Sequence, residues 1–310
     1  MQKAYINSLY SLMKKDKNVI SCLSDSGTDY DEMIARELPN QCVNFGISEN
    51  NKVAAAAGLA SCGKIPFVYT TSSFLAYRSY EFIRDDVCLQ NRNVKLVGMG
   101  SGISWSTLGP THHATEDISV LKAIPNLTIL SPASPKELEK CIEYAYEKKG
   151  PVYIRMGMGH EREIYDECNF KISTNSLISD GNGLTIFTTG SIISEVLDAK
   201  ELLLKDGINA RIINISTIKP LDITGIVEEC KDQKNIVTIE ENNIIGGIGS
   251  SVADVIAEYG LDCNLNKIGL NDCFAAGYGT YDEIRKMNKL DSESIYIKIK
   301  NYLTKNNVQI

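Results

Sequence analysis

Short apolar runs alternate with longer helical stretches along most of this chain. An apolar run of about four to eight residues between polar, Gly or Pro residues is typical of a buried strand, whereas apolar residues recurring every three or four positions predict a helix. Their alternation predicts an α/β protein with mostly parallel sheets flanked by helices. The pattern occurs in two successive series, which indicates two domains.

The first series predicts a sheet whose strands are separated by helices. The predicted strands cover residues 19–23, 42–45, 65–70, 94–99, 127–130 and 152–156, and the predicted helices cover residues 49–61, 73–86, 115–123 and 135–147. Pro135 suits the first turn of its helix and Ser134 suits the capping position before it.

The second series begins at residue 184. Its predicted strands cover residues 184–188, 210–215 and 236–239, and its predicted helices cover residues 194–205, 249–259 and 292–303. The stretch 157–183 is polar and has no clear period, so we place the domain connection there. We therefore expect one domain at residues 1–160, a linker at 161–183 and a second domain at 184–310.

Composition and charge exclude several classes of protein. The net charge is -7 with a pI near 5.2, and without a basic run the chain offers no surface for nucleic acid or for anionic membranes. Residues 1–16 are amphipathic but interrupted by polar residues, so they predict neither a signal peptide nor a membrane span. The 9 cysteines show no CxxC pair and no metal-ligand spacing with His, so we expect reduced thiols, a cytoplasmic protein and no metal site.

A carboxylate stands where a predicted strand passes into a helix. The strand ends near Gly46, Ser48 occupies the capping position and Glu49 is the first helical residue. One interpretation is that Glu49 only complements the positive end of the helix dipole. The other is that it faces the ligand crevice at the carboxyl ends of the strands, where a partly desolvated carboxyl group exchanges a proton with a ligand nitrogen.

Two further segments are candidates for chemistry. Phe74, Tyr77, Arg78 and Tyr80 fall near one another at helical spacing, which is typical of core, although three polar tips there need partners. The Gly- and Ser-rich loop 98–117 contains His112, a neighbouring histidine and the only Trp of the chain. Histidines in such a loop are candidates for hydrogen bonding or proton transfer, or lie exposed on a flexible loop.

Together these segments resemble the transketolase family, in particular the C-terminal component of transketolases split over two chains, and less closely 1-deoxyxylulose-5-phosphate synthase. The resemblance covers nearly the whole chain. It is carried by FGISENN around Glu49, IPFVYTTSSFLAYRSYEFIRDDV from Ile65, GPTHHATED from Gly109, IPNLTILSPAS from Ile124 and GPVYIRMG from Gly150. It implies a pyrimidine-binding domain of the thiamine diphosphate-binding fold, followed by a transketolase C-terminal domain.

The resemblance also implies roles for individual residues. The glutamate matching Glu49 hydrogen-bonds the aminopyrimidine of thiamine diphosphate and activates the cofactor. Phe74, Tyr77 and Tyr80 match the aromatic residues of the pyrimidine pocket, with Tyr77 expected to stack on the ring. His112 matches a histidine that faces the substrate carbonyl and hydroxyl groups and is the second expected catalytic residue.

The remaining implied contacts are with the substrate. Arg155 lies near a phosphate-binding arginine of the family, and Ser26 is the other expected substrate residue. Two positions depart from the family pattern, because Leu108 replaces an aspartate and Gly100 replaces a histidine, both of which contact hydroxyls of the sugar. These departures put ordinary pentose phosphates in doubt and leave a modified or unphosphorylated sugar as an alternative.

The chain lacks the family's diphosphate and metal motif, a GDG followed at a distance by Asn. The resemblance therefore implies an N-terminal partner subunit that carries this motif and holds a divalent cation, Mg²⁺ or Ca²⁺. It also implies self-association into a dimer, within a heterotetramer of two copies of each chain.

The leading expectation is an enzyme subunit that transfers a two-carbon ketol unit from a ketose, or ketose phosphate, to an aldose. One alternative is a decarboxylating relative, similar to 1-deoxyxylulose-5-phosphate synthase or to the beta subunit of a 2-oxo-acid dehydrogenase. Another is a non-catalytic assembly subunit that kept the fold.

Overall fold

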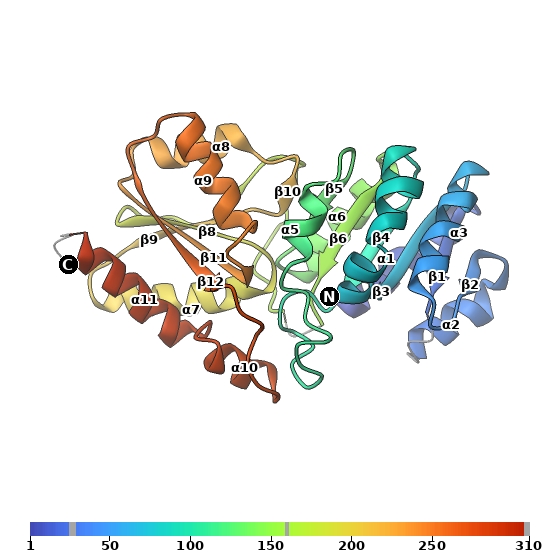
Figure 1. Cartoon of the computed structure of the whole chain (residues 1–310), viewed down its shortest axis with the longest axis horizontal. Helices are drawn as coiled ribbons and strands as arrows, with labels where there is room; N and C mark the ends of the chain where they lie inside the picture. Colours follow the sequence, from blue (N-terminus) through green and yellow to red (C-terminus); the bar gives the residue numbers. More distant parts are fainter. Residues whose placement is uncertain (25–28, 159–160, 307–310) are drawn as a thin grey trace.

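A computed structural model of the chain describes residues 1–24, 29–158 and 161–306. It contains two sheets with helices on both faces, lying side by side in the molecule (Figure 1). This is the predicted architecture of two α/β domains with mostly parallel sheets.

The first sheet has seven strands in the order β10-β5-β6-β4-β3-β1-β2. The strands are β1 (Val19–Leu23), β2 (Cys42–Asn44), β3 (Ile65–Thr71), β4 (Lys95–Met99), β5 (Thr128–Leu130), β6 (Val152–Met156) and β10 (Thr217–Lys219). Neighbours are parallel except β10, which runs antiparallel to β5. Strands β1, β4, β5 and β6 are buried along their whole length, as expected for a sheet covered on both faces.

Helices cover both faces of this sheet. The apolar side chains of α1 (Gln2–Lys15) and α6 (Pro135–Glu147) pack on one face. On the other face lie α3 (Glu49–Ser61) and α5 (Asp117–Lys122). A short helix, α2 (Asp29–Glu37), and a 3-10 turn, η1 (Pro39–Gln41), connect β1 to β2. Ser134 caps α6 as predicted, because its hydroxyl accepts the backbone N–H of Glu137.

The predicted helix at 73–86 is helical but not a regular α-helix. It consists of a π-helical turn, η2 (Phe74–Arg78), a short α-helix, α4 (Tyr80–Phe82), and a second π-helical stretch, η3 (Ile83–Leu89). A π turn holds more residues than an α turn, so side chains along it point in directions that a regular spacing does not predict.

The second sheet has five strands in the order β12-β11-β8-β9-β7. They are β7 (Ser176–Ser179), β8 (Leu184–Thr188), β9 (Ala210–Asn214), β11 (Asn235–Asn243) and β12 (Asn264–Leu270), with only β7 antiparallel to its neighbour. After a 3-10 turn, η4 (Gly190–Ile192), the helices α7 (Ile193–Lys205), α10 (Tyr281–Met287) and α11 (Ser292–Lys305) pack on one face. Helices α8 (Ile223–Lys231) and α9 (Ile248–Glu258) pack on the other.

Several elements have no counterpart in the sequence prediction, namely β7, β10, β12, α2, α8 and α10. Three of them, β7, β10 and β12, are edge strands with a neighbour on one side only. An edge strand is partly exposed, so its sequence lacks a continuous apolar run, as NLNKIGL in β12 illustrates. Strand β7 lies inside the segment 161–183 that we expected to be a linker.

In the described ranges, no helix is both long and apolar enough to cross a membrane. The same ranges contain no group of three or more His, Cys, Asp or Glu side chains arranged to hold a metal ion. No disulfide joins any of the cysteines, all of which lie at described positions.

Candidate functional site

Glu49 is the first residue of α3 and follows the carboxyl end of β2. Its side chain is largely enclosed, with 7% of the residue exposed. Ser48 occupies the N-cap position as predicted, although its hydroxyl makes no capping hydrogen bond to the described helix. The start of α3 therefore presents the Glu49 carboxylate at the carboxyl end of β2.

Side chains from the segment after β3 meet this carboxylate. Arg78 Nη1 lies 3.4 Å from Glu49 Oε2. The same guanidinium lies over the face of Phe74, with Cζ 3.9 Å from the ring centroid. The His112 ring packs edge-on against Phe74 at 4.9 Å between centroids. We call these four residues, Glu49, Phe74, Arg78 and His112, the Glu49 cluster.

The loop after β4 fixes the position of His112. Thr111 Oγ1 lies 3.0 Å from His112 Nδ1, and the Ser73 hydroxyl donates to the His112 carbonyl at 3.1 Å. The Trp105 ring lies 6.1 Å from the imidazole. Partial burial, and secondarily the nearby Arg78 charge, lower the pKa of His112, so the imidazole is neutral at neutral pH.

Tyr77 and Tyr80 belong to a neighbouring cavity. The Tyr77 hydroxyl donates to Glu116 Oε2 at 2.8 Å and accepts the Glu116 backbone N–H at 3.0 Å. The cavity has a volume of about 340 Å³ and is lined by Ala76, Tyr77, Tyr80, Val120 and Ala123. Of the predicted aromatic stripe, Arg78 thus contacts Glu49 and Phe74 contacts His112, whereas the two tyrosines face α5.

Arg155 is buried in β6, with 2% of the residue exposed. Its Nε donates to both carboxylate oxygens of Asp117, at 2.9 and 3.0 Å, and its Nη2 donates to the carbonyls of Ala114 and Glu241. The structure therefore gives Arg155 an internal ion pair that ties α5 to β6, and does not bring it into the Glu49 cluster. Ser26 lies outside the described residues.

The two departures from the family pattern lie in the loop 98–117, which we call the histidine loop. Gly100 has a φ of +80°, and a Cβ added there would lie 2.1 Å from Trp105 Nε1. The indole of Trp105 therefore occupies the space beside Gly100. Leu108 is 43% exposed, and so presents an apolar side chain on this loop.

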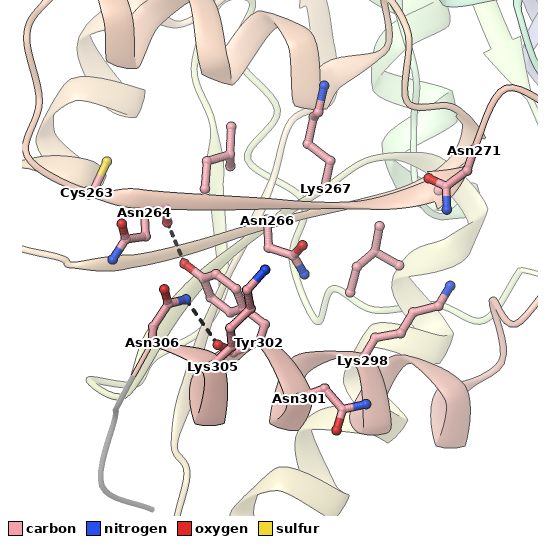
Figure 2. Close-up of a pocket in the computed structure, with 13 residues that line it drawn as sticks. Cys263, Asn264, Asn266, Lys267, Asn271, Lys298, Asn301, Tyr302, Lys305 and Asn306 are labelled. Carbon is pink, nitrogen blue, oxygen red and sulfur yellow. Dashed lines mark hydrogen bonds between the residues drawn. The ribbon is translucent and has the colours of Figure 1, made fainter.

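A larger cavity of the described chain lies elsewhere. It is a groove of about 680 Å³ between β12 and α11, lined mainly by Lys and Asn side chains (Figure 2). It shares no lining residue with the Glu49 cluster. A smaller cavity of about 450 Å³ lies at the cluster and is lined by Ile47, Ser48, Glu49, Asn50 and Arg78. We assign the candidate site to the smaller cavity, because it is lined by Glu49 and Arg78 of the Glu49 cluster.

Two residues of this region were not among the predicted site residues. Arg78 was noted within the aromatic stripe, and its position four residues after Phe74 was the available signal for a contact between them. Asp117 had no signal, because its partner Arg155 lies far along the chain and pairs with it only in the folded state.

Comparisons with known proteins match both halves of the chain. The family description "Transketolase, pyrimidine binding domain" matches residues 1–160, and "Transketolase, C-terminal domain" matches residues 175–295. The chain is 40% identical over 303 residues to the "Putative transketolase C-terminal section" of Methanocaldococcus jannaschii, covering 96% of this chain and 95% of that protein. It is 35% identical to one of the subunits of an apulose-4-phosphate transketolase of Actinobacillus succinogenes, covering 94% of each.

A solved structure described as "Split gene transketolase, inactive beta4 tetramer" is also similar. It superposes with a TM-score of 0.87 at 29% sequence identity, covering 98% of this chain and 97% of that one. Both halves of the chain are thus accounted for by one family. The chain belongs to the transketolase family, and is related along nearly its whole length to the C-terminal part of transketolases that are split over two chains.

Proposed function

We propose that this chain is the C-terminal subunit of a two-chain, thiamine diphosphate-dependent transketolase. It transfers a two-carbon ketol unit from a ketose, or ketose phosphate, to an aldose acceptor. It acts only with an N-terminal subunit that carries the GDG motif and holds the diphosphate and the divalent cation. Two relatives of similar length, one named as a transketolase C-terminal section and the other as a transketolase subunit, support this division of the enzyme.

The contact geometry of the Glu49 cluster carries the proposal. An enclosed carboxylate and an aromatic face are bridged by the flat, nitrogen-bearing guanidinium of Arg78. An aminopyrimidine is likewise flat, stacks on an aromatic ring and hydrogen-bonds a carboxyl group. The residues present therefore fit the pyrimidine of the cofactor, with Glu49 at its ring nitrogen and the aromatic side chains of the pocket, Phe74 and Tyr77 among them, against its ring.

When bound, thiamine diphosphate supplies the nucleophilic carbon that carries the ketol unit. Glu49 exchanges a proton with the ring nitrogen of the cofactor, and its enclosure keeps water from competing for that proton. Phe74 fixes the plane of the ring. The neutral His112 donates or accepts a hydrogen bond at a substrate oxygen, while Tyr77 and Tyr80 form the adjoining wall.

The histidine loop bears on the choice of sugar. Trp105 fills the space beside Gly100, and Leu108 replaces a polar contact with an apolar one. We propose that the donor is a ketose without hydroxyl groups facing Gly100 and Leu108, such as a branched or modified ketose phosphate. The relative named for apulose 4-phosphate makes that compound the first to test.

The test is turnover by the complex of this chain with the N-terminal subunit, assayed with a panel of ketose donors. We expect Glu49→Gln to lower turnover by about 10²- to 10⁴-fold, the usual contribution of a positioned acid or base, with unchanged co-purification. Glu81→Gln is the matched control, because Glu81 is exposed on the neighbouring helical segment. Near-normal turnover by Glu49→Gln would refute the assignment of Glu49.

The same complex separates the alternative functions. Consumption of pyruvate with release of CO₂ would identify a decarboxylating relative instead. A complex that assembles but is inactive with every donor and with pyruvate would favour an assembly subunit.

A further inference from the structure

Arg78 stands in the position that the proposed function gives to the cofactor. Its guanidinium lies 3.9 Å from the centroid of Phe74 and 3.4 Å from Glu49 Oε2. One planar group thus contacts both the ring and the carboxylate of the candidate site. We propose that Arg78 is an internal occupant of the pyrimidine site, which fills that site in the cofactor-free subunit and must leave it before the cofactor binds.

The guanidinium occupies the space between Phe74 and Glu49, because it contacts the ring of the one and the carboxylate of the other. In the proposed function, a pyrimidine that hydrogen-bonds Glu49 within the aromatic pocket needs the same space. Two flat groups cannot both lie there, so the cofactor and the guanidinium exclude each other.

The contacts of Arg78 are suited to exchange. Its side chain is 52% exposed, whereas that of Glu49 is 8% exposed, so the carboxylate is fixed while the arginine reaches solvent. The ion pair is long, and an exposed cation–π contact is weak. The cavity of about 450 Å³ at Ile47 and Asn50 lies directly beside Arg78 and offers space into which its side chain can rotate.

Arg78 also gives the enclosed Glu49 carboxylate a counter-charge. A carboxylate withdrawn from water is costly unless a cation pairs with it. The π-helical turn Phe74–Arg78 holds both side chains on the same side of the segment, so rotation of the arginine about its side-chain bonds suffices to open the site. The arginine therefore stabilises the cofactor-free state and opposes loading.

The inference rests on the proposed function and is tested by cofactor binding, not by turnover. Titration calorimetry of thiamine diphosphate with Mg²⁺ into the cofactor-free complex of both subunits would compare wild type with Arg78→Met, which keeps the apolar stem. If the guanidinium blocks about nine-tenths of the sites, the variant binds about tenfold more tightly. We also expect Arg78→Met to bind thiamine diphosphate faster than wild type does, and its cofactor-free complex to melt at a lower temperature.

Two further variants sharpen this test. Arg78→Lys keeps the charge but not the flat face, so we expect its affinity to lie between those of wild type and Arg78→Met. Arg84→Met is the matched control, because Arg84 is exposed on the same helical segment and pairs with Asp85. Its affinity should equal that of wild type.

The possible failures are distinguishable. Equal or weaker binding by Arg78→Met, with normal binding by wild type and by Arg84→Met, would overturn the inference and leave the proposed function intact. Failure of wild type and Arg84→Met to bind thiamine diphosphate would overturn the proposed function, and the inference with it.

Discussion

The packing of Trp105 explains why position 100 is a glycine. The Gly100 backbone has a φ of +80°, and the Trp105 indole closes the space into which a Cβ would project. Gly63 has a similar φ of +82°, but a Cβ there would meet nothing within 4 Å. The two glycines share a backbone conformation and differ in packing.

We predict that Gly100→Ala destabilises the chain more than Gly63→Ala does. Both variants strain a left-handed backbone, but only Gly100→Ala forces Trp105 to move, which adds about 1–3 kcal/mol to the loss in the free energy of unfolding. Chemical denaturation followed by circular dichroism measures the difference. Equal losses in the two variants would contradict a packing role for the indole.

For the predicted site residues, the sequence identified the types of side chain better than it identified their contacts. Glu49, Phe74 and His112 do converge, as the motif order implied. The hydroxyl of Tyr77 bonds Glu116, a contact that the sequence did not indicate, and the expected position of its ring on the cofactor stays a prediction. The sequence shows which residue types are present, but not which partner each side chain contacts in the folded chain.

At the scale of elements, Glu240 links β11 to the start of α9. Its carboxylate accepts the backbone N–H groups of Ile248 and Gly249, at 2.9 and 3.0 Å. Burial raises the pKa of Glu240 to about 7, although these hydrogen bonds and the charges of Arg155 and Lys122 act in the opposite direction. The folded chain thus holds a proton on Glu240 at a pH where the unfolded chain has released it.

We predict a pH dependence of stability from this group. Between the unfolded pKa of about 4.3 and the folded value the native state binds more protons, so the Glu240 contribution to the free energy of unfolding falls as pH rises, by up to about 1.4 kcal/mol per pH unit. Glu240→Gln should flatten this slope, measured by denaturation at pH 5, 6 and 7. Glu258→Gln, at the exposed end of α9, is the control and should keep it. A slope unchanged in Glu240→Gln would contradict the prediction.

Elements with a continuous apolar run or a clear helical period were predicted within one or two residues in most cases, as β8 and α6 illustrate. The segment after β3 was predicted as helical, but not its π turns. A π turn depends on packing against the sheet and on the neighbouring loop, and the apolar pattern carries no signal for it.

At the scale of the whole molecule, the two sheets are not independent. Strand β10 comes from the second half of the chain, yet pairs with β5 at the edge of the first sheet. One hydrophobic core cluster runs from the first sheet to α8 and α9 of the second half. Figure 1 shows β5 and β10 where the two halves meet.

We predict that residues 1–160 do not form a stable domain when produced alone. The fragment lacks β10, exposes the edge of β5 and uncovers apolar side chains that the second half buries, so it should aggregate or unfold without cooperativity. Size-exclusion chromatography with light scattering and thermal denaturation test this, with the full chain as control. A monomeric fragment that melts cooperatively near the temperature of the full chain would contradict it.

By itself the sequence determined the alternation of strands and helices, the start of α3 at Glu49 and the membership of a family, because these depend on local patterns and motif order. Only the tertiary structure decided that β10 completes the first sheet, that Asp117 neutralises Arg155 and that Arg78 lies between Glu49 and Phe74. Each of these depends on contacts between segments far apart in the chain, where burial selects one partner among several chemically equivalent ones.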